Sequence, residues 1–211
     1  MRSINKANII AAFSITLLIF IAGFSTSTLV YNRKISTIQE LQESLYTDNL
    51  EIEAQYELAY QDVCDITSLL TLNRNLNELS EKLQYLEKEM LDENSQSILK
   101  NIKRQYFVLE IKHWLFVQSV KEECNYDYST ILYFYANRDC PACEAQGLVL
   151  TEYKQTHQNT MIYSFDTRFP ESQIVSNLID KYNISEAPSI IYNDNVFDYL
   201  VSSEELENLI N

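Results

Sequence analysis

The 211-residue chain is poor in residues that interrupt helices. It has two glycines and three prolines, and none of these five lies between Phe24 and Asp139. Glycine and proline are the strongest local breakers of regular structure. Their absence from so long a stretch favours long helices there.

Basic residues are also scarce. The chain has 16 lysines and arginines against 30 acidic residues, a formal net charge of −14. A nucleic-acid-binding protein needs a basic surface, so this composition argues against nucleic acid as a partner. Hydrophobic residues make up 46% of the chain, which excludes an intrinsically disordered protein.

Charge is absent from Ala7 to Asn32, and Ile9 to Leu29 is mostly apolar. That length is enough to cross a bilayer, so residues 1–32 are predicted to be a transmembrane anchor. A cleaved signal peptide is the alternative. Its apolar core would be shorter, and Ser25-Thr26-Ser27 is a poor cleavage site.

The charges that flank this segment are nearly balanced. Arg2 and Lys6 lie on one side, and Arg33 and Lys34 on the other. With the terminal amine, the positive-inside rule leans towards a cytoplasmic N-terminus. We therefore expect a single-pass membrane protein with residues 33–211 outside the cytoplasm. An even number of cysteines suits an oxidising compartment.

Residues 33–124 are predicted to be a helical hairpin or coiled-coil stalk. Two series of apolar positions alternate steps of three and four, as in a coiled-coil or bundle seam. The first series is Leu76, Leu79, Leu83, Leu86 and Met90, and the second is Leu99, Ile102, Tyr106, Leu109, His113, Phe116 and Val120.

A polar stretch, Asp92 to Ser95, separates the two series. It predicts a turn between two antiparallel helices, Leu76–Leu91 and Gln96–Glu123. Two readings of the preceding residues are open. Asn73 and Asn75 mark a further break, or the first helix runs through from Ile35.

Cys64 and Cys124 each lie thirty residues from Asn94. In a hairpin that turns at Asn94 the two cysteines come level, so a Cys64–Cys124 disulfide is predicted to clamp its open end. The alternative is two separate buried thiols, because free cysteine packs as a small apolar residue.

Residues 125–211 alternate strand and helix patterns. A strand–helix–strand start implies parallel pairing of the first two strands. Asn193-Asp194-Asn195 suits a hairpin between the last two strands. The predicted elements are strand Ile131–Ala136, helix Cys140–His157, strand Met161–Asp166, helix Ser172–Tyr182, strand Ser189–Tyr192, strand Val196–Val201 and helix Ser203–Ile210.

The motif Cys140-Pro141-Ala142-Cys143 joins the first strand to the following helix. Two cysteines at this spacing lie within disulfide reach, and the positive end of a helix favours a thiolate. A zinc site would need two more ligands, and there is no second C-x-x-C. An inert disulfide is the other alternative. We interpret the pair as redox-active, with no metal and no organic cofactor.

This element order, with the C-x-x-C motif and with Ala187-Pro188 before the third strand, resembles the short, glutaredoxin-sized form of the thioredoxin-like fold, over Ser129 to Asn211. The resemblance implies that Cys140 attacks and that Cys143 resolves. It also implies that Pro188 lies in a cis-proline loop beside the disulfide, and that the Ala187 backbone meets an extended substrate.

The chain departs from the thioredoxin pattern at three places. Tyr133 and Phe134 stand where many thioredoxins carry a buried acid, Asp139 stands where they carry tryptophan, and Pro-Ala replaces Gly-Pro. The direction of the redox reaction is therefore open. Two further expectations are that His113 packs in a core or interface and that Gly147 makes a tight contact with a strand or partner.

The predicted function is that of a membrane-anchored thiol–disulfide oxidoreductase outside the cytoplasm. Its expected partners are protein thiols and disulfides and an unidentified redox partner. The helical region would serve as a spacer and as a surface for self-association. The alternative is a non-catalytic, membrane-tethered interaction protein with a thioredoxin-like docking module.

Overall fold

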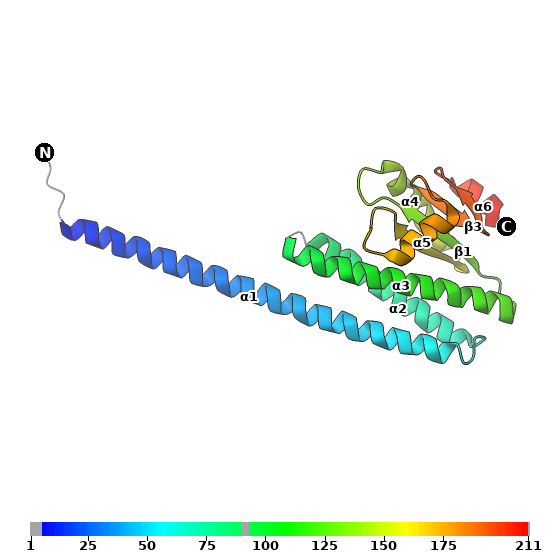
Figure 1. Cartoon of the computed structure of the whole chain (residues 1–211), viewed down its shortest axis with the longest axis horizontal. Coiled ribbons are helices and arrows are strands. Elements are labelled where there is room, and N and C mark those ends of the chain that lie inside the picture. The colour runs from blue at the N-terminus through cyan, green and yellow to red at the C-terminus, as the bar shows by residue number, and fades with distance from the viewer. Residues whose placement is uncertain (1–5, 90–92, 211) are drawn as a thin grey trace. The chain divides into compact units, whose positions relative to one another are not determined.

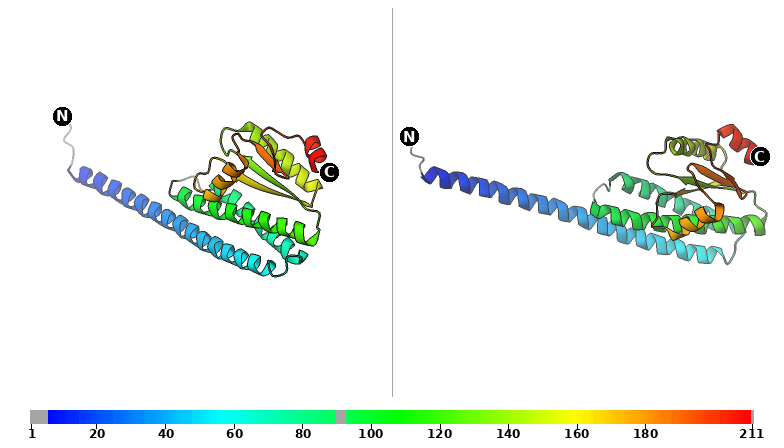
Figure 2. Two further views of the ribbon diagram at one scale, coloured as in Figure 1. Left: turned by 45° about the vertical axis from the view of Figure 1, so that its right-hand side comes forward. Right: turned by 45° about the horizontal axis from the view of Figure 1, so that its top comes forward.

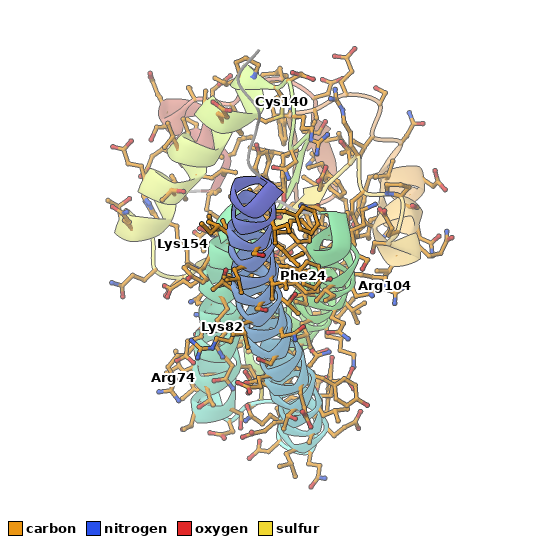
Figure 3. All side chains as sticks on the ribbon, turned by 90° about the vertical axis from the view of Figure 1, so that its left-hand side faces the viewer. Phe24, Arg74, Lys82, Arg104, Cys140 and Lys154 are labelled. Carbon is orange, nitrogen blue, oxygen red and sulfur yellow. A yellow bond between two sulfur atoms is a disulfide. The ribbon has the colours of Figure 1, made fainter. Side chains whose placement is uncertain are left out.

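The computed structural model describes residues 6–89 and 93–210. It divides the chain into two compact units, Met1–Thr47 and Asp48–Asn211. The long helix α1, Lys6–Ala59, contributes to both. Its segment Phe13–Arg33 is 21 residues long and unburied, and its length and composition are sufficient to cross a membrane. Phe24, labelled in Figure 3, lies within this segment.

Helix α1 ends at Ala59, and α2, Ile66–Glu89, follows after a short turn. Asp65 caps α2, because its carboxylate accepts the backbone N–H groups of Thr67 at 3.0 Å and Ser68 at 3.2 Å. These two bonds satisfy donors that the first turn of a helix leaves unpaired. The break therefore lies at residues 60–65.

Both sequence readings of this region are wrong. Helix α2 continues through Asn73 and Asn75, and α1 does not run into it. The side chain of Asn75 donates to Gln55 Oε1 at 2.7 Å, so this asparagine joins α2 to α1 rather than ending a helix.

Helix α3, Glu93–Cys124, packs beside α2 (Figure 1). A disulfide joins Cys64 to Cys124, with the two Cα atoms 5.5 Å apart. Leu91 and Asp92, where the sequence analysis ended a helix and began a turn, lie outside the described residues. Residues 93–95, which were expected to lie in the turn, belong to α3. The apolar side chains buried along α2 and along the facing side of α3 include Leu76, Leu79, Leu83, Leu86, Leu99, Ile102, Leu109, Phe116 and Val120.

A four-stranded sheet follows, in the order β2-β1-β3-β4. Strands β1 and β2 are parallel, with Tyr133 opposite Ser164, and β1 pairs antiparallel with β3. The remaining elements are β1 Ser129–Tyr135, α4 Pro141–Thr156, β2 Thr160–Asp166, α5 Gln173–Tyr182, β3 Ser189–Tyr192, β4 Asn195–Phe197 and α6 Ser203–Ile210.

The two faces of the sheet are covered differently. In the right-hand view of Figure 2, α4 and α6 lie on one side of the sheet, and α3 and α5 on the other. On the α4 side the buried core consists of Ile131, Tyr133, Leu150, Tyr153, Ile190, Val201 and Leu206. On the α3 side Phe107 packs edge-on against Phe165 of β2, with ring centroids 5.8 Å apart.

Helix α3 is therefore buried along two sides, one against the neighbouring helices and one against the sheet. Tyr56 of α1 packs edge-on against Phe116 of α3, with the ring centroids 6.2 Å apart, and both residues lie within the same compact unit. The helical residues from Asp48 onward thus belong to the same compact unit as the sheet.

Strand β4 is shorter than predicted. It ends at Phe197 instead of Val201. The residues after it turn towards solvent, with Tyr199 50% and Leu200 41% exposed. Val201 is buried again, and its backbone pairs with the side chain of Gln146 rather than with a strand.

Candidate functional site: a disulfide at the start of α4

Cys140 and Cys143 form a disulfide at the N-terminus of α4, with their Cα atoms 5.2 Å apart. Cys140 is the N-cap residue, and Pro141 occupies the first helical position. Proline is tolerated there because the N–H that it lacks would be unpaired in any case. Cys140 is partly exposed, whereas Cys143 is 5% exposed.

Each sulfur accepts a backbone hydrogen bond. The Cys143 N–H donates to Cys140 Sγ at 3.2 Å, and the Ala136 N–H donates to Cys143 Sγ at 3.4 Å. After reduction, such donors would favour the charged thiolate over the thiol. The positive end of α4 acts in the same direction on Cys140.

The peptide bond between Ala187 and Pro188 is cis. The Ala187 carbonyl oxygen lies 3.6 Å from Cys140 Sγ. The loop between β1 and α4 and the residues just before β3 therefore meet at the disulfide. The structure thus brings together Cys140, Cys143 and the Ala187-Pro188 pair. The other predicted pair, Cys64 and Cys124, is joined in the helical part of the chain.

Hydrogen bonds from the segment that follows β2 fix the loop that leads into the disulfide. Asp139 has φ of 53°, a left-handed conformation that aspartate tolerates better than most residues. The Arg168 guanidinium donates to the Arg138 carbonyl oxygen at 2.9 Å, and the Thr167 N–H donates to the Tyr135 carbonyl oxygen at 2.8 Å. These bonds fix the entry of the chain into Cys140.

A cleft of about 580 Å³ begins at the disulfide. Its floor includes Tyr133, Tyr135, Ile162 and Ser164 of the sheet. One side is α4, from Cys143 to Gln155, and another is formed by α2 and α3. In Figure 3, Cys140 and Lys154 mark the two ends of α4 along this cleft.

Titratable groups from α2 and α3 reach the sheet beside the cleft. The Lys103 ammonium lies 3.1 Å from Asp166 at the end of β2 and 3.1 Å from Glu87. Glu110 accepts the N–H of Ser164 at 3.1 Å and the hydroxyl of Tyr106 at 3.2 Å. Burial raises the pKa of Glu110 to about 8, so its carboxyl group holds a proton at neutral pH.

Sequence reasoning missed this set of groups. A signal was present, because Lys103 and Glu110 stand seven residues apart, with Phe107 between them, on a side of α3 that the apolar series does not use. Such spacing predicts a second buried face on the same helix. The predicted apolar series occupies only one side of α3, so burial of this second face was not predicted.

The two histidines lie away from the disulfide. His113 is 1% exposed, its Nδ1 lies 2.7 Å from the Tyr163 hydroxyl, and burial lowers its pKa to about 3. His157 ends α4 and lies 3.2 Å from a Glu207 carboxylate oxygen. Among residues 6–89 and 93–210, no group of three or more His, Cys, Asp and Glu side chains is arranged to hold a metal ion.

The sequence suggested a tight contact of Gly147 with a strand or a partner, and the structure shows none with a strand. A Cβ atom placed on it would meet nothing within 4 Å among the described residues. Gly147 borders the cleft, so the space above this turn of α4 is open.

No protein-family model matches the chain, and no curated protein matches it. Among solved structures, a malarial protein is 26% identical, over 39% of this chain and 93% of its own, with a TM-score of 0.34. Thioredoxin-2, described as a component of malaria parasite protein secretion machinery, is 26% identical, over 39% of this chain and 81% of its own, with a TM-score of 0.33. Thioredoxin O1 from Arabidopsis thaliana is 19% identical, over 47% of this chain and 92% of its own, with a TM-score of 0.35. The chain thus has thioredoxins among its structural neighbours, and each of these matches covers less than half of it.

Proposed function

We propose that this protein is a membrane-anchored thiol–disulfide oxidoreductase that exchanges disulfides with protein substrates outside the cytoplasm. One observation carries the proposal. A partly exposed sulfur, that of Cys140, stands at the positive end of a helix, with a second, buried sulfur bonded to it and the Ala187 carbonyl oxygen 3.6 Å away.

The reduced protein would act in two steps. The Cys140 thiolate attacks one sulfur of a substrate disulfide, forms a mixed disulfide and displaces the other substrate sulfur as a thiolate, which takes up a proton. The Cys143 thiolate then attacks Cys140 Sγ and displaces the second substrate sulfur. The substrate gains two electrons, and the protein returns to the Cys140–Cys143 disulfide. The reverse sequence oxidises a substrate dithiol.

The roles of the two cysteines follow from their exposure. A substrate sulfur can approach Cys140, which is partly exposed, but not Cys143, which is 5% exposed. The backbone at Ala187, beside Cys140, offers a carbonyl group to an extended substrate chain. An unidentified redox partner would restore the starting state of the pair.

The location outside the cytoplasm is supported by two features. The segment Phe13–Arg33 is apolar and long enough to anchor the chain, by length and composition. All four cysteines are in disulfides, a state that persists in oxidising compartments. After mild reduction of intact cells, a membrane-impermeant maleimide should label Cys140. Labelling only after the cells are lysed would contradict this orientation.

The activity is tested with the full chain in detergent. Cys143→Ser should accumulate a mixed disulfide through Cys140, while Cys140→Ser should abolish both trapping and turnover of a peptide disulfide. Cys64→Ser combined with Cys124→Ser is the matched control, because it also removes one disulfide, the one in the helical part of the chain. Turnover that persists in Cys140→Ser would refute the proposal and favour a non-catalytic interaction protein.

A further inference from the structure

Helix α2 carries a polar stripe beside its buried leucines. Each buried leucine of the series Leu72, Leu76, Leu79, Leu83 and Leu86 is followed directly by a polar residue. All five of these polar residues border the cleft that begins at Cys140, and they are Asn73, Asn77, Ser80, Gln84 and Glu87. One side of α2 thus packs in the core while the adjacent side faces the cleft.

The side chains of this stripe are unusual for the exposed side of a helix. Asn73, Asn77 and Gln84 are uncharged, and within the described part of the chain none of the three side chains has a hydrogen-bond partner. Asparagine is also a poor helix former. A carboxamide offers both donors and an acceptor, which is what a peptide backbone requires of a partner.

Gly147 is a second, independent feature of the same cleft. Glycine inside a helix costs about 0.5–1 kcal/mol relative to alanine. The described residues give no steric reason for it, since a Cβ atom there would meet nothing within 4 Å. Its absence of a side chain keeps the space beside α4 open and leaves the α4 backbone approachable.

The stripe has a defined direction relative to the disulfide. Glu87 forms an ion pair with Lys103, and Lys103 also contacts Asp166 at the end of β2. Asp166 is paired with Tyr135 at the end of β1, where the chain leaves the sheet towards Cys140. The Glu87 end of the stripe is therefore the end near the disulfide. From Gln84 to Asn73 the stripe then runs for about 16 Å, at about 1.5 Å per residue. That length matches about five residues of extended chain, at about 3.3 Å each.

We propose that this cleft binds an extended segment of the substrate polypeptide next to its reactive cysteine, with Asn73, Asn77 and Gln84 hydrogen bonding to the segment's backbone and Gly147 leaving room for it. The inference rests on the proposed function and names where its substrate binds. A site for a small ligand typically has a few polar groups that converge on one point. Repeated carboxamides, one and two helical turns apart along the same side of α2, instead suit a chain that repeats the same groups.

The test compares two substrates of the full chain in detergent. One is a disulfide-linked pair of eight-residue peptides, and the other is cystamine, a disulfide that has no peptide backbone. The first variant combines Asn73→Ala, Asn77→Ala and Gln84→Ala, changes that favour the helix. The second is Gly147→Leu, which fills the open space. For each, the ratio of kcat/KM for the peptide to kcat/KM for cystamine should fall at least tenfold.

The matched controls lie on the same helices but do not border the cleft. They are Glu81→Ala with Tyr85→Ala on α2, and Glu152→Leu on α4, and both should keep the ratio within twofold of the parent. Thermal unfolding shows that each variant is folded. An unchanged ratio in the carboxamide and Gly147→Leu variants, or equal losses on both substrates, would overturn the inference while leaving the redox activity established. If the parent chain turns over neither substrate, the proposed function fails first, and the inference fails with it.

Discussion

The side chain of Gln146 forms two hydrogen bonds with the backbone of Val201. Its Oε1 accepts the Val201 N–H at 2.7 Å, and its Nε2 donates to the Val201 carbonyl oxygen at 3.1 Å. Gln146 is fully buried. One residue of α4, in the turn after Cys143, thus takes the place of a neighbouring strand for the chain that leads into α6.

Replacing this glutamine should destabilise the fold. Gln146→Leu leaves a backbone N–H and a carbonyl group buried without partners, at a cost of about 1–3 kcal/mol each. We expect the free energy of unfolding to fall by about 2–4 kcal/mol, measured by chemical denaturation of the full chain in detergent. Gln173→Leu, at an exposed position of α5, should change it by less than about 0.5 kcal/mol. Equal stability of the two variants would contradict a structural role for these bonds.

The Cys64–Cys124 disulfide should contribute stability without contributing activity. It spans 60 residues of sequence, and closing such a loop in the unfolded chain corresponds to about 4 kcal/mol in the chain-entropy model. Cys64→Ser with Cys124→Ser should therefore lower the unfolding midpoint, while turnover of a peptide disulfide through Cys140 and Cys143 continues. Loss of turnover in a variant that is still folded would show that this disulfide takes part in the redox reaction.

Gly147→Ala should stabilise the protein. Alanine is the better helix former by about 0.5–1 kcal/mol, and the added methyl group meets no described atom within 4 Å. The gain is measured as a rise in the unfolding midpoint of the full chain. Leu148→Ala, on the exposed side of the same helix turn, should give no comparable rise. A lower midpoint for Gly147→Ala would mean that the space beside α4 is closed.

The elements from Ser129 to Ile210 follow one another in the predicted order because each carries its own local pattern. To predict that Cys64 and Cys124 lie level with each other, it was enough to count residues from Asn94. The end of α1 was harder to predict, since no glycine or proline marks it. Its one local signal is Asp65, an N-cap residue three positions ahead of Ser68.

Tertiary contacts account for what the patterns did not predict. A helix pattern read for one seam assigns one buried side, but Phe107 and Glu110 of α3 are buried against a sheet that begins only later in the chain. The cleft has the same origin, because α2 and α4 are far apart in sequence and both border it. For Gly147, sequence alone does not separate a glycine in a tight contact with a strand from one beside open space.

Glu110 should make the stability of the protein depend on pH. Its pKa is raised by burial from 4.5 to about 8, so between these pH values the folded state holds a proton that the unfolded state has released. Stability linked to this group is therefore present at low pH, falls as the pH rises from 4.5 to about 8, and is constant above that. For a shift of this size the limiting loss is about 5 kcal/mol.

Glu110→Gln should remove this dependence, because glutamine is an uncharged analogue of the protonated acid that can still accept from the Ser164 N–H and the Tyr106 hydroxyl. The free energy of unfolding of Glu110→Gln should be close to that of the parent at pH 4.5, and should exceed it by about 3–5 kcal/mol at pH 8. Thermal unfolding of both full chains at the two pH values gives the difference. Effects of pH on carboxylates common to both chains cancel. Glu152→Gln, at an exposed carboxylate of α4, is the control and should show no such rise. A difference between Glu110→Gln and the parent that is the same at both pH values would show that this carboxyl group is already ionised in the folded protein.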